Sequence, residues 1–569
     1  MSRRNDLDRG LTNYGDPEFA SYLRRSFAKS MGYSSAMLGK PIIGIATSAS
    51  GFNNCHRLTP ELVEAVSRGV LAAGGLPLPF PTISLGEVFL NPTSLVFRNL
   101  MSMDVEEMIR AQPMSAVVLV GGCDKTVPAQ LMGAISAGVP AIQLVVGPMM
   151  TGRYQGERLG ACTDCRRYWA RFRSGQTTSE EIEDVENNLA VTAGTCAVMG
   201  TASTMACLVE ALGMTVPDSA AAPAAHADRL RIAEATGTEA ARLAQSGIVP
   251  GAVVTRESIE NAARVLLAIG GSTNGVIHLA AIAGRVGLPF DLRALNALSG
   301  TTPVLVNLKP TGEHYMEDLH AAGGMQAVLQ ELEPLLHTDC LTVTGERLGD
   351  RLRRPRRFVD RAVVRPMSDP FRATGGLVAL FGNLAPNGCV LKRAAADERL
   401  FEHVGRAVVF TDLADLSRRI DDPELDVTPD DVLVLQNAGS IGAGMPEAGY
   451  VPIPAKLARA GVKDMVRVSD ARMSGTAFGT VVLHVSPECA IGGPLGLVRN
   501  GDRIQLSVSQ RRIDVLVPDD ELAARRVSVE ARPVPARGYA RLYAQSVLGP
   551  ELGCDFDFLR AEAPSPHSS

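Results

Sequence analysis

Apolar runs of strand length alternate with amphipathic helical patterns over the first two thirds of the chain. The strand-like runs lie at 41–48, 76–84, 116–122 and 141–147. Segment 59–75 has apolar residues at helical spacing and ends in two glycines. Longer helical patterns follow at about 178–213, 226–246 and 256–287. This order favours an α/β fold in which helices cover a layered parallel sheet.

The pattern changes after the basic segment 351–360, where short strand-like runs are separated by Gly, Pro and Asp. These runs lie at 432–437, 481–486, 503–509 and 512–518. Such spacing predicts a β-barrel-like C-terminal domain. We therefore expect two domains, 1–370 and 371–569. The basic segment is interpreted as a solvated connector, and the chain end at 563–569 is expected to be disordered.

Length and charge narrow the class of protein. At 569 residues and 60.2 kDa the chain is too long for one ordinary hydrophobic core. A net charge of -5 and a pI near 6.1 give no reason to expect a nucleic acid or a membrane as partner. The polar N-terminus lacks the apolar core of a signal peptide, and no apolar run reaches the roughly 18 residues of a membrane span. A cytoplasmic protein is expected.

Ten cysteines are spread over the chain, too sparsely for a fold held by disulfides. Three of them, Cys55, Cys123 and Cys196, lie in turns rich in Gly or Asn beside the end of a predicted element. Exposed backbone N–H groups in such turns lower the pKa of a thiol and favour the thiolate. Three thiolates from separate loops suit an iron-sulfur cluster with one iron open to a substrate. The alternative for each is a buried core residue.

Cys123 is followed directly by Asp124 and Lys125, at the carboxyl end of the predicted strand 116–122. Open α/β sheets bind their ligands at this edge. Taken alone, the triplet also fits a surface ion pair beside a packed cysteine.

Long motifs connect the chain to a known family. They include GGCDKTVPAQLMGA (121–134), GGSTNGVIHLAAIA (270–283), LKPTGEHYMEDLHAAGGM (308–325) and VSDARMSGTAFGTVVLHVSPE (468–488). These motifs occur in the same order as in the dihydroxyacid dehydratase and phosphogluconate dehydratase family, which the sequence resembles over nearly the whole chain. GERLGACTDCRRYW (156–169) is more similar to the sugar-acid dehydratases, which act on aldonates such as L-arabinonate or D-xylonate, than to the branched-chain amino-acid enzyme.

The resemblance implies a set of site residues at the interface of the two domains. Cys55, Cys123 and Cys196 match the ligands of a [2Fe-2S] cluster. The residues matching the Mg²⁺ ligands are Glu87, Asp124, Glu447 and Lys125, the last as a carbamylated, catalytically required lysine. Ser474 matches the catalytic base, and Thr163 and Thr476 match substrate contacts. Cys123 and Asp124 would then hold a soft and a hard metal site side by side.

The function implied is that of a hydro-lyase that converts an aldonate to a 2-keto-3-deoxy acid. The nearer alternative is a dihydroxyacid dehydratase of branched-chain amino-acid synthesis, and the distant one is a non-catalytic binding protein on the same scaffold. Related enzymes are homo-oligomers, so a homodimer or homotetramer is expected. A small-molecule sugar acid is the expected partner.

Several further side chains have ordinary interpretations. The CxxC at 162–165 is interpreted as a loop that lines the substrate pocket, since no second CxxC accompanies it. Four histidines are expected to be core or supporting residues: His56, His278, His320 and His484. The remaining cysteines are expected to be structural: Cys207, Cys340, Cys389, Cys489 and Cys554.

Overall fold

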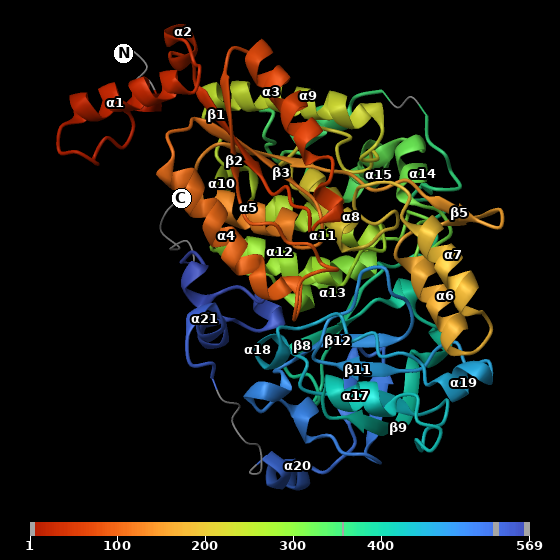
Figure 1. Cartoon of the computed structure of the whole chain (residues 1–569). Helices are drawn as coiled ribbons and strands as arrows, with labels where there is room; N and C mark the ends of the chain where they lie inside the picture. The colour runs from red at the N-terminus through yellow and green to blue at the C-terminus, as the bar shows by residue number, and fades with distance from the viewer. Residues whose placement is uncertain (1–5, 356–357, 527–533, 563–569) are drawn as a thin grey trace.

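The computed structural model describes residues 6–355, 358–526 and 534–562 (Figure 1). Its first sheet has four parallel strands in the order β2-β1-β3-β4. The strands are β1 Ile42–Thr47, β2 Leu76–Pro81, β3 Ala116–Gly121 and β4 Ala141–Val145. Each lies within a run that the apolar pattern predicts, and the predicted parallel α/β architecture is confirmed.

Alternate residues of β3 pack into different hydrophobic clusters on the two faces of the sheet. Val118 and Val120 pack with helices α3 (Thr59–Ala72) and α9 (Ala227–Ser246). Val117 and Leu119 pack with α4 (Ser94–Ala111). Because both faces are covered, the strands are apolar throughout, as buried parallel strands are.

Glycine allows α3 and α9 to pack with their backbones in contact. A Cβ atom on Gly69 of α3 would lie 1.9 Å from the carbonyl oxygen of Glu234, and one on Gly237 of α9 would lie 2.1 Å from that of Val66. A larger residue at either position would separate the helices. The pair therefore forms a fixed layer behind the sheet.

Two predicted long helices are each interrupted. The stretch 178–213 forms α7 (Ser179–Leu189) and α8 (Thr201–Ala211), and the loop 190–200 between them carries Cys196. The stretch 256–287 forms α11 (Arg256–Ala268) and α12 (Asn274–Arg285). Gly270, with φ of +57°, ends α11 because this backbone conformation is unfavourable for other residues. The loop at 190–200 agrees with the Gly-rich turn predicted around Cys196, and both interruptions shorten the predicted helical stretches.

The second sheet is mixed and has eight strands in the order β14-β13-β9-β10-β11-β12-β8-β7. The strands are β7 Val378–Leu380, β8 Gly388–Leu391, β9 Glu402–Phe410, β10 Val432–Leu435, β11 Arg467–Ser469, β12 Val481–Ser486, β13 Arg503–Ser507 and β14 Arg512–Val515. A bridge between Phe381, just after β7, and Arg512 of β14 links the two edges. The sheet is therefore nearly closed, which confirms the predicted barrel-like architecture.

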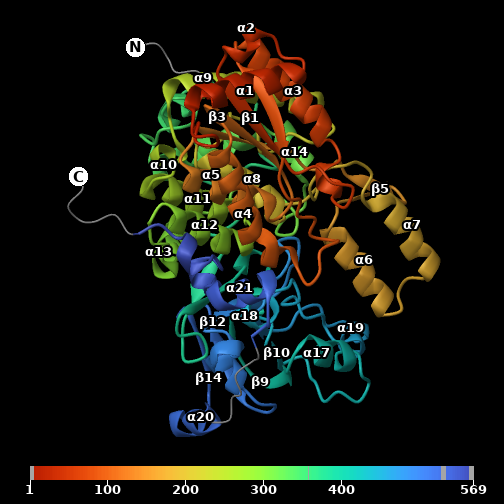
Figure 2. The same cartoon turned by 60° about the vertical axis from the view of Figure 1, so that its left-hand side comes forward.

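The remaining elements surround these two sheets (Figures 1 and 2). The helices are α1 Pro17–Ser30, α2 Ser35–Leu38, α5 Thr126–Ala137, α6 Thr163–Arg173, α10 Pro250–Val253, α13 Leu292–Thr301, α14 Met316–Ala321, α15 Gly324–Leu332, α16 Leu348–Leu352, α17 Leu413–Arg419, α18 Ser440–Ala443, α19 Ala455–Arg459, α20 Asp519–Arg526 and α21 Gly538–Ser546. A small hairpin is formed by β5 Gly152–Tyr154 and β6 Glu157–Leu159. In Figure 1, α1 extends away from the body at the upper left.

The end of the described chain returns to the α/β part. Arg98 of α4 donates a hydrogen bond to the carbonyl oxygen of Cys554 (2.8 Å). Arg285 of α12 forms an ion pair with Asp555 (Nε to Oδ2, 2.7 Å), and both side chains are fully buried. Removing either partner of such a pair leaves an uncompensated buried charge. These contacts fasten the C-terminal segment, which follows the barrel, against the α/β part.

The basic segment 351–360 is only partly a solvated connector. Arg351 is buried and donates a hydrogen bond to the carbonyl oxygen of Thr215 (3.3 Å). That part of the prediction is wrong, because α16 packs this residue against the α/β part. Residues 356–357 and the expected disordered end at 563–569 lie outside the described residues.

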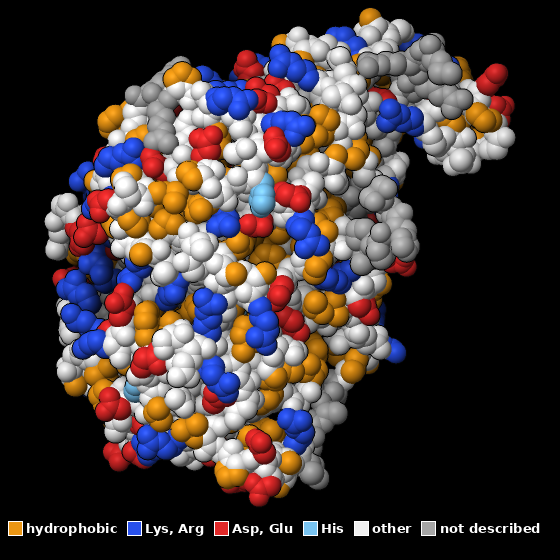
Figure 3. All heavy atoms as spheres, turned by 180° about the vertical axis from the view of Figure 1, so that it is seen from behind, with side chains coloured by type: hydrophobic (Ala, Val, Ile, Leu, Met, Phe, Trp, Pro, Cys, Tyr) orange, Lys and Arg blue, Asp and Glu red, His pale blue; other side chains and the backbone are white. Residues whose placement is uncertain are grey.

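The face seen in Figure 3 has acidic and basic side chains interspersed rather than separated by sign. Among the described residues, no helix is both long enough and apolar enough to cross a membrane.

Candidate active site

A buried histidine joins the two loops that carry the first two candidate cysteines. Cys55 lies in a short 3-10 turn, Asn54–His56, after β1, and Cys123 follows β3. The N–H of Gly122 lies 2.9 Å from Nε2 of His56, and the carbonyl oxygen of Ser48 lies 2.9 Å from Nδ1. Burial lowers the pKa of His56, against the effect of the carbonyl oxygens of Gly122 and Ser48, so the ring is neutral and holds both loops.

The three candidate cluster cysteines lie near one another at the carboxyl edge of the parallel sheet. The Cys55 thiol hydrogen-bonds with the Cys123 thiol. Residue Cys123 has a backbone φ of +67°. Cys196 approaches from the loop 190–200 and is close enough to interact electrostatically with Cys55 and Asp124. The structure thus brings together side chains that are far apart in the sequence.

A fourth thiol, which the sequence analysis placed on a loop lining the pocket but not next to the cluster ligands, lies beside this group. Sγ of Cys162 is 3.4 Å from Sγ of Cys196, whereas the Cys165 thiol points to the carbonyl oxygen of Cys162 (2.6 Å). The CxxC spacing was the available signal, but only its first member contacts a candidate cluster ligand. Thr163, predicted to contact substrate, is buried in the same turn.

Cys55 and Cys196 do not have the low pKa predicted from their turns. The hydrogen bond with Cys123, followed by burial, raises the pKa of Cys55. The hydrogen bond with Cys162, followed by burial, raises the pKa of Cys196. The prediction is wrong for these two residues because burial beside other thiols outweighs the N–H groups of the turns. Metal binding requires thiolates, so a bound cation would have to displace these protons.

Three carboxylates from both parts of the chain converge beside the thiols. Glu87 lies between β2 and α4, Asp124 follows β3, and Glu447 follows α18. Each offers an oxygen within 4.8 Å of the others. Clustered carboxylate oxygens suit a hard divalent cation such as Mg²⁺.

Two fully buried cations contact these carboxylates. Nζ of Lys125 lies 2.8 Å from Oε2 of Glu87 and 3.6 Å from Oδ2 of Asp124. Arg472 reaches Oε1 of Glu87 at 2.8 Å and Oε1 of Glu447 at 2.5 Å. The sequence analysis missed Arg472, although it lies in the quoted ARMSG motif, two residues before Ser474. Arg472 connects the barrel part to the α/β part across the site.

The charges in this cluster are compatible with the binding of a further cation. Burial raises the pKa of Asp124 to about 7, an effect that Lys125 opposes and Glu447 and Glu87 reinforce. Burial would also raise the pKa of Glu87, but Arg472 and Lys125 lower it. Asp124 therefore gains a proton near neutral pH that a bound divalent cation would displace. The donor set fits Mg²⁺ in chemistry and in charge.

Ser474 lies in a tightly packed turn after β11. Its Oγ is 2.8 Å from Oγ1 of Thr476, and the Thr163 hydroxyl donates to the carbonyl oxygen of Thr476 (3.0 Å). A Cβ on Gly475 would lie 2.6 Å from the backbone nitrogen of Thr201, the first residue of α8. The turn is therefore pressed against the helix that follows the Cys196 loop, and both candidate substrate contacts are linked to Ser474.

A buried lysine beside this turn was also missed. Nζ of Lys392, after β8, donates to the carbonyl oxygen of Gly475 (3.3 Å), and the residue is fully buried. Burial lowers its pKa to about 7. Only its position after an apolar strand, in the motif LFGNLAPNGCVLK, could have indicated it.

Lys392 gives a testable pH dependence. The unfolded chain keeps the Lys392 proton up to the ordinary lysine pKa near 10.4, whereas the folded chain loses it near pH 7. Because the unfolded state binds more protons in this window, the unfolding free energy should rise with pH, by up to about 1.4 kcal/mol per pH unit. We expect the melting temperature of the wild type to rise between pH 7 and 10 relative to that of Lys392→Met. Parallel melting curves over this range would contradict a neutral buried lysine.

A parallel α/β sheet and a nearly closed barrel, with thiols and carboxylates meeting between them, form the scaffold of a dehydratase, a hydro-lyase that eliminates water from its substrate. The chain belongs to the dihydroxy-acid/6-phosphogluconate dehydratase family. The N-terminal model of that family matches residues 40–351, and its C-terminal model matches residues 362–554. The resemblance seen in the motifs is confirmed.

Individual relatives are similar over almost their whole length. The chain is 45% identical to L-arabonate dehydratase of Azospirillum brasilense, covering 99% of this chain and 100% of that protein. It is 44% identical to 6-deoxy-6-sulfo-D-gluconate dehydratase of Pseudomonas putida, covering 93% and 92%. Identity to the dihydroxy-acid dehydratase of Syntrophobacter fumaroxidans is 37%, covering 93% and 96%.

Proposed function

We propose that this enzyme removes water from an aldonate to give a 2-keto-3-deoxy acid. The observation that carries the proposal is the convergence of thiols and half-buried carboxylates at the edge of the parallel sheet, with Asp124 next to Cys123 in the chain. Ser474 lies two residues after Arg472, which contacts two of these carboxylates. The higher identity to two sugar-acid dehydratases than to the dihydroxy-acid dehydratase supports the substrate class.

The residues of the site fit two metal groups. Cys55, Cys123 and Cys196 would hold a [2Fe-2S] cluster, and the thiol of Cys162 lies next to this set. The ligands of Mg²⁺ would be Glu87, Asp124, Glu447 and a carbamylated Lys125, whose Nζ already lies among the carboxylates. When bound, such groups supply Lewis acidity that stabilises negative charge on substrate oxygens.

The protein's own residues would carry the proton chemistry. The C2–H bond of the aldonate breaks and its proton passes to the deprotonated Oγ of Ser474. The C3–O bond breaks, and the departing hydroxide takes up that proton from Ser474 and leaves as water. The enol product then tautomerises to the 2-keto acid. Ser474 is held for this task by Thr476 and by the packing of Gly475. Thr163 supports the same turn from α6.

Arg472 is assigned a positioning role. It binds one carboxylate from each part of the chain and thereby fixes the distance between Glu87 and Glu447. Its guanidinium is planar and always charged, so it keeps both carboxylates oriented while other groups in the site exchange protons.

The alternative substrate class is a branched-chain 2,3-dihydroxy acid, which undergoes the same elimination. Hydroxyl groups at C4 to C6 of an aldonate need polar partners, whereas a branched chain needs an apolar wall. We expect kcat/KM for at least one aldonate to exceed that for 2,3-dihydroxyisovalerate by at least about tenfold, since each 1.4 kcal/mol of lost contact is a factor of ten. The assay compares both substrate classes with one anaerobically purified preparation. A preference for 2,3-dihydroxyisovalerate would favour the alternative.

We also propose a cytoplasmic homodimer or homotetramer. Support for assembly comes from α1, which extends from the body and leaves apolar side chains uncovered, among them Phe19, Phe27 and, just after the helix, Met31. Large apolar side chains gathered on one projecting helix are typical of surfaces that bind protein.

A further inference from the structure

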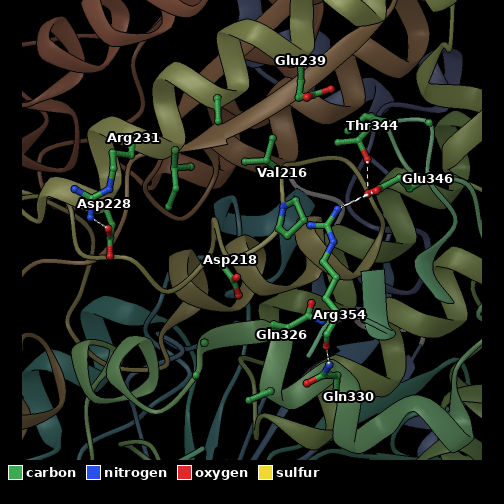
Figure 4. A pocket seen from close by; sticks show the side chains of 18 of the residues that line it. Val216, Asp218, Asp228, Arg231, Glu239, Gln326, Gln330, Thr344, Glu346 and Arg354 are labelled. Carbon is green, nitrogen blue, oxygen red and sulfur yellow. Dashed lines mark hydrogen bonds and ion pairs between the residues drawn. The ribbon is translucent and has the colours of Figure 1, made fainter. Parts of the chain in front are cut away.

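A second group of potential metal ligands lies on the edge of a large cavity outside the candidate active site. The cavity has a volume of about 1150 Å³ and is lined by residues of α9, α15 and the segment 343–359. Figure 4 shows Asp228 with its partner Arg231 on one side, and Arg354 with Glu346 on the other. Asp228 and His320 both line this cavity.

Three side chains from two helices form this group. His226 caps the N-terminus of α9, Asp228 lies in the first turn of the same helix, and His320 lies in the last turn of α14. Oδ2 of Asp228 is 3.0 Å from Nε2 of His320 and 3.4 Å from Nδ1 of His226. One ligand atom from each residue lies within 4.8 Å of the others.

These separations are those of a zinc site. Two donors bonded to one tetrahedral Zn²⁺ at 2.0–2.1 Å lie about 3.3 Å apart. Two of the three pairs are already near this value, so small movements of the side chains would complete the set. Two imidazoles and one carboxylate are donors that suit Zn²⁺, Co²⁺ or Ni²⁺ rather than Mg²⁺.

The present partners of the group can be exchanged at low cost. Nδ1 of His226 accepts a hydrogen bond from the backbone N–H of Asp228 (3.1 Å), and a bound cation would replace this single contact. Arg231 pairs with Asp228, but its side chain is 70% exposed and can turn into solvent. A simple hydrogen-bonded cluster would account for the same contacts, and the two interpretations differ in what the group does with a metal ion.

We propose that His226, Asp228 and His320 bind one divalent cation of the zinc class. Three protein ligands leave the fourth position to water or to a small ligand from the cavity. The site is distinct from the proposed dehydratase centre, whose ligands are cysteines and carboxylates.

The cation would link the two elements that flank the Cys196 loop. The backbone N–H of Met316, which begins α14, donates to the carbonyl oxygen of Ala197 (2.8 Å). Before α9, the N–H of Ala224 donates to the carbonyl oxygen of Pro148 (2.8 Å), and a Cβ on Gly194 would contact both Pro148 and Ala224. A bound ion would thus hold α9 and α14 at a fixed separation on both sides of this loop.

Equilibrium dialysis of the full-length holoenzyme against Zn²⁺, with metal analysis, tests the proposal. We expect His320→Ala and His226→Ala each to lose one equivalent of bound zinc relative to the wild type. His226 is 46% exposed at its side chain, so this second variant should fold even if the first does not. Replacement of Arg231 by Gln should keep the site and tighten it, since the cation competing for Asp228 is removed.

The matched control is His337→Ala. His337 also pairs with a carboxylate, Glu260 (Nε2 to Oε2, 3.2 Å), and is 43% exposed, but it has no second histidine beside it among the described metal-ligand groups. This variant should bind as much zinc as the wild type. Equal zinc content in the wild type and His226→Ala, or the same loss in His337→Ala, would overturn the proposal. Neither outcome depends on turnover, so failure of the proposed dehydration would leave this test unaffected.

Discussion

Ser474→Ala is expected to lower turnover of an aldonate by a factor on the order of 10² to 10⁴ while iron, sulfide and magnesium stay bound. Ser474 is the proposed acceptor of the C2 proton, and alanine removes the oxygen without adding volume. No candidate metal ligand is changed, and the turn remains held by Gly475 against α8. Turnover and metal content are measured on the same preparation.

Ser469 provides the matched control in the same segment. Its Oγ accepts a hydrogen bond from the N–H of Ala471 (3.0 Å), so it stabilises the turn without contacting Ser474. Ser469→Ala should cost about 1 kcal/mol of stability, as for a lost cap, with turnover nearly intact. If Ser474→Ala retains its metals and near-normal turnover, Ser474 is not the base.

Cys123→Ser is expected to abolish both the iron-sulfur cluster and turnover. A serine hydroxyl is a hard, weakly acidic ligand that replaces thiolate poorly at iron. Cys123 also has a left-handed backbone conformation between the sheet and α5, which fixes the direction of its side chain. Iron and acid-labile sulfide analysis, with the visible spectrum, measures the loss.

Cys340→Ser is the control for this change. Cys340 lies in the α/β part, and its sulfur accepts a hydrogen bond from Nδ2 of Asn261 (3.5 Å), which a serine oxygen can also accept. The variant should keep its cluster and its turnover. Full iron content in Cys123→Ser would show that Cys123 is not a cluster ligand.

The fold was predictable where the apolar residues of a segment follow a single regular pattern. Buried strands such as β3 read as continuous apolar runs, and α9 follows its predicted range closely. The helical stretches 178–213 and 256–287 were predicted too long, because the chain turns at 190–200 and near Gly270 although helical composition continues there. There, tertiary contacts and a positive φ decide the conformation, and neither is visible in local periodicity.

The candidate site was predictable only where ligands follow strands or occupy known motifs. Asp124 and Cys123 stand at the end of β3, so the topology of a parallel sheet indicates their position. Arg472, Lys392 and Cys162 were not assigned, because each reaches the site through packing between distant segments. The ARMSG motif, the CxxC and the apolar run before Lys392 mark these segments in the sequence, but they do not indicate which distant side chains the three residues contact.

The most direct test of the account is the identity of the product formed from an aldonate. The enzyme, purified anaerobically and supplied with Mg²⁺, is incubated with L-arabinonate and D-xylonate, and the products are analysed by nuclear magnetic resonance. The account predicts one equivalent of a 2-keto-3-deoxy acid, with a methylene group at C3, for each aldonate consumed. Absence of this product from every aldonate tested, together with rapid dehydration of 2,3-dihydroxyisovalerate, would contradict it.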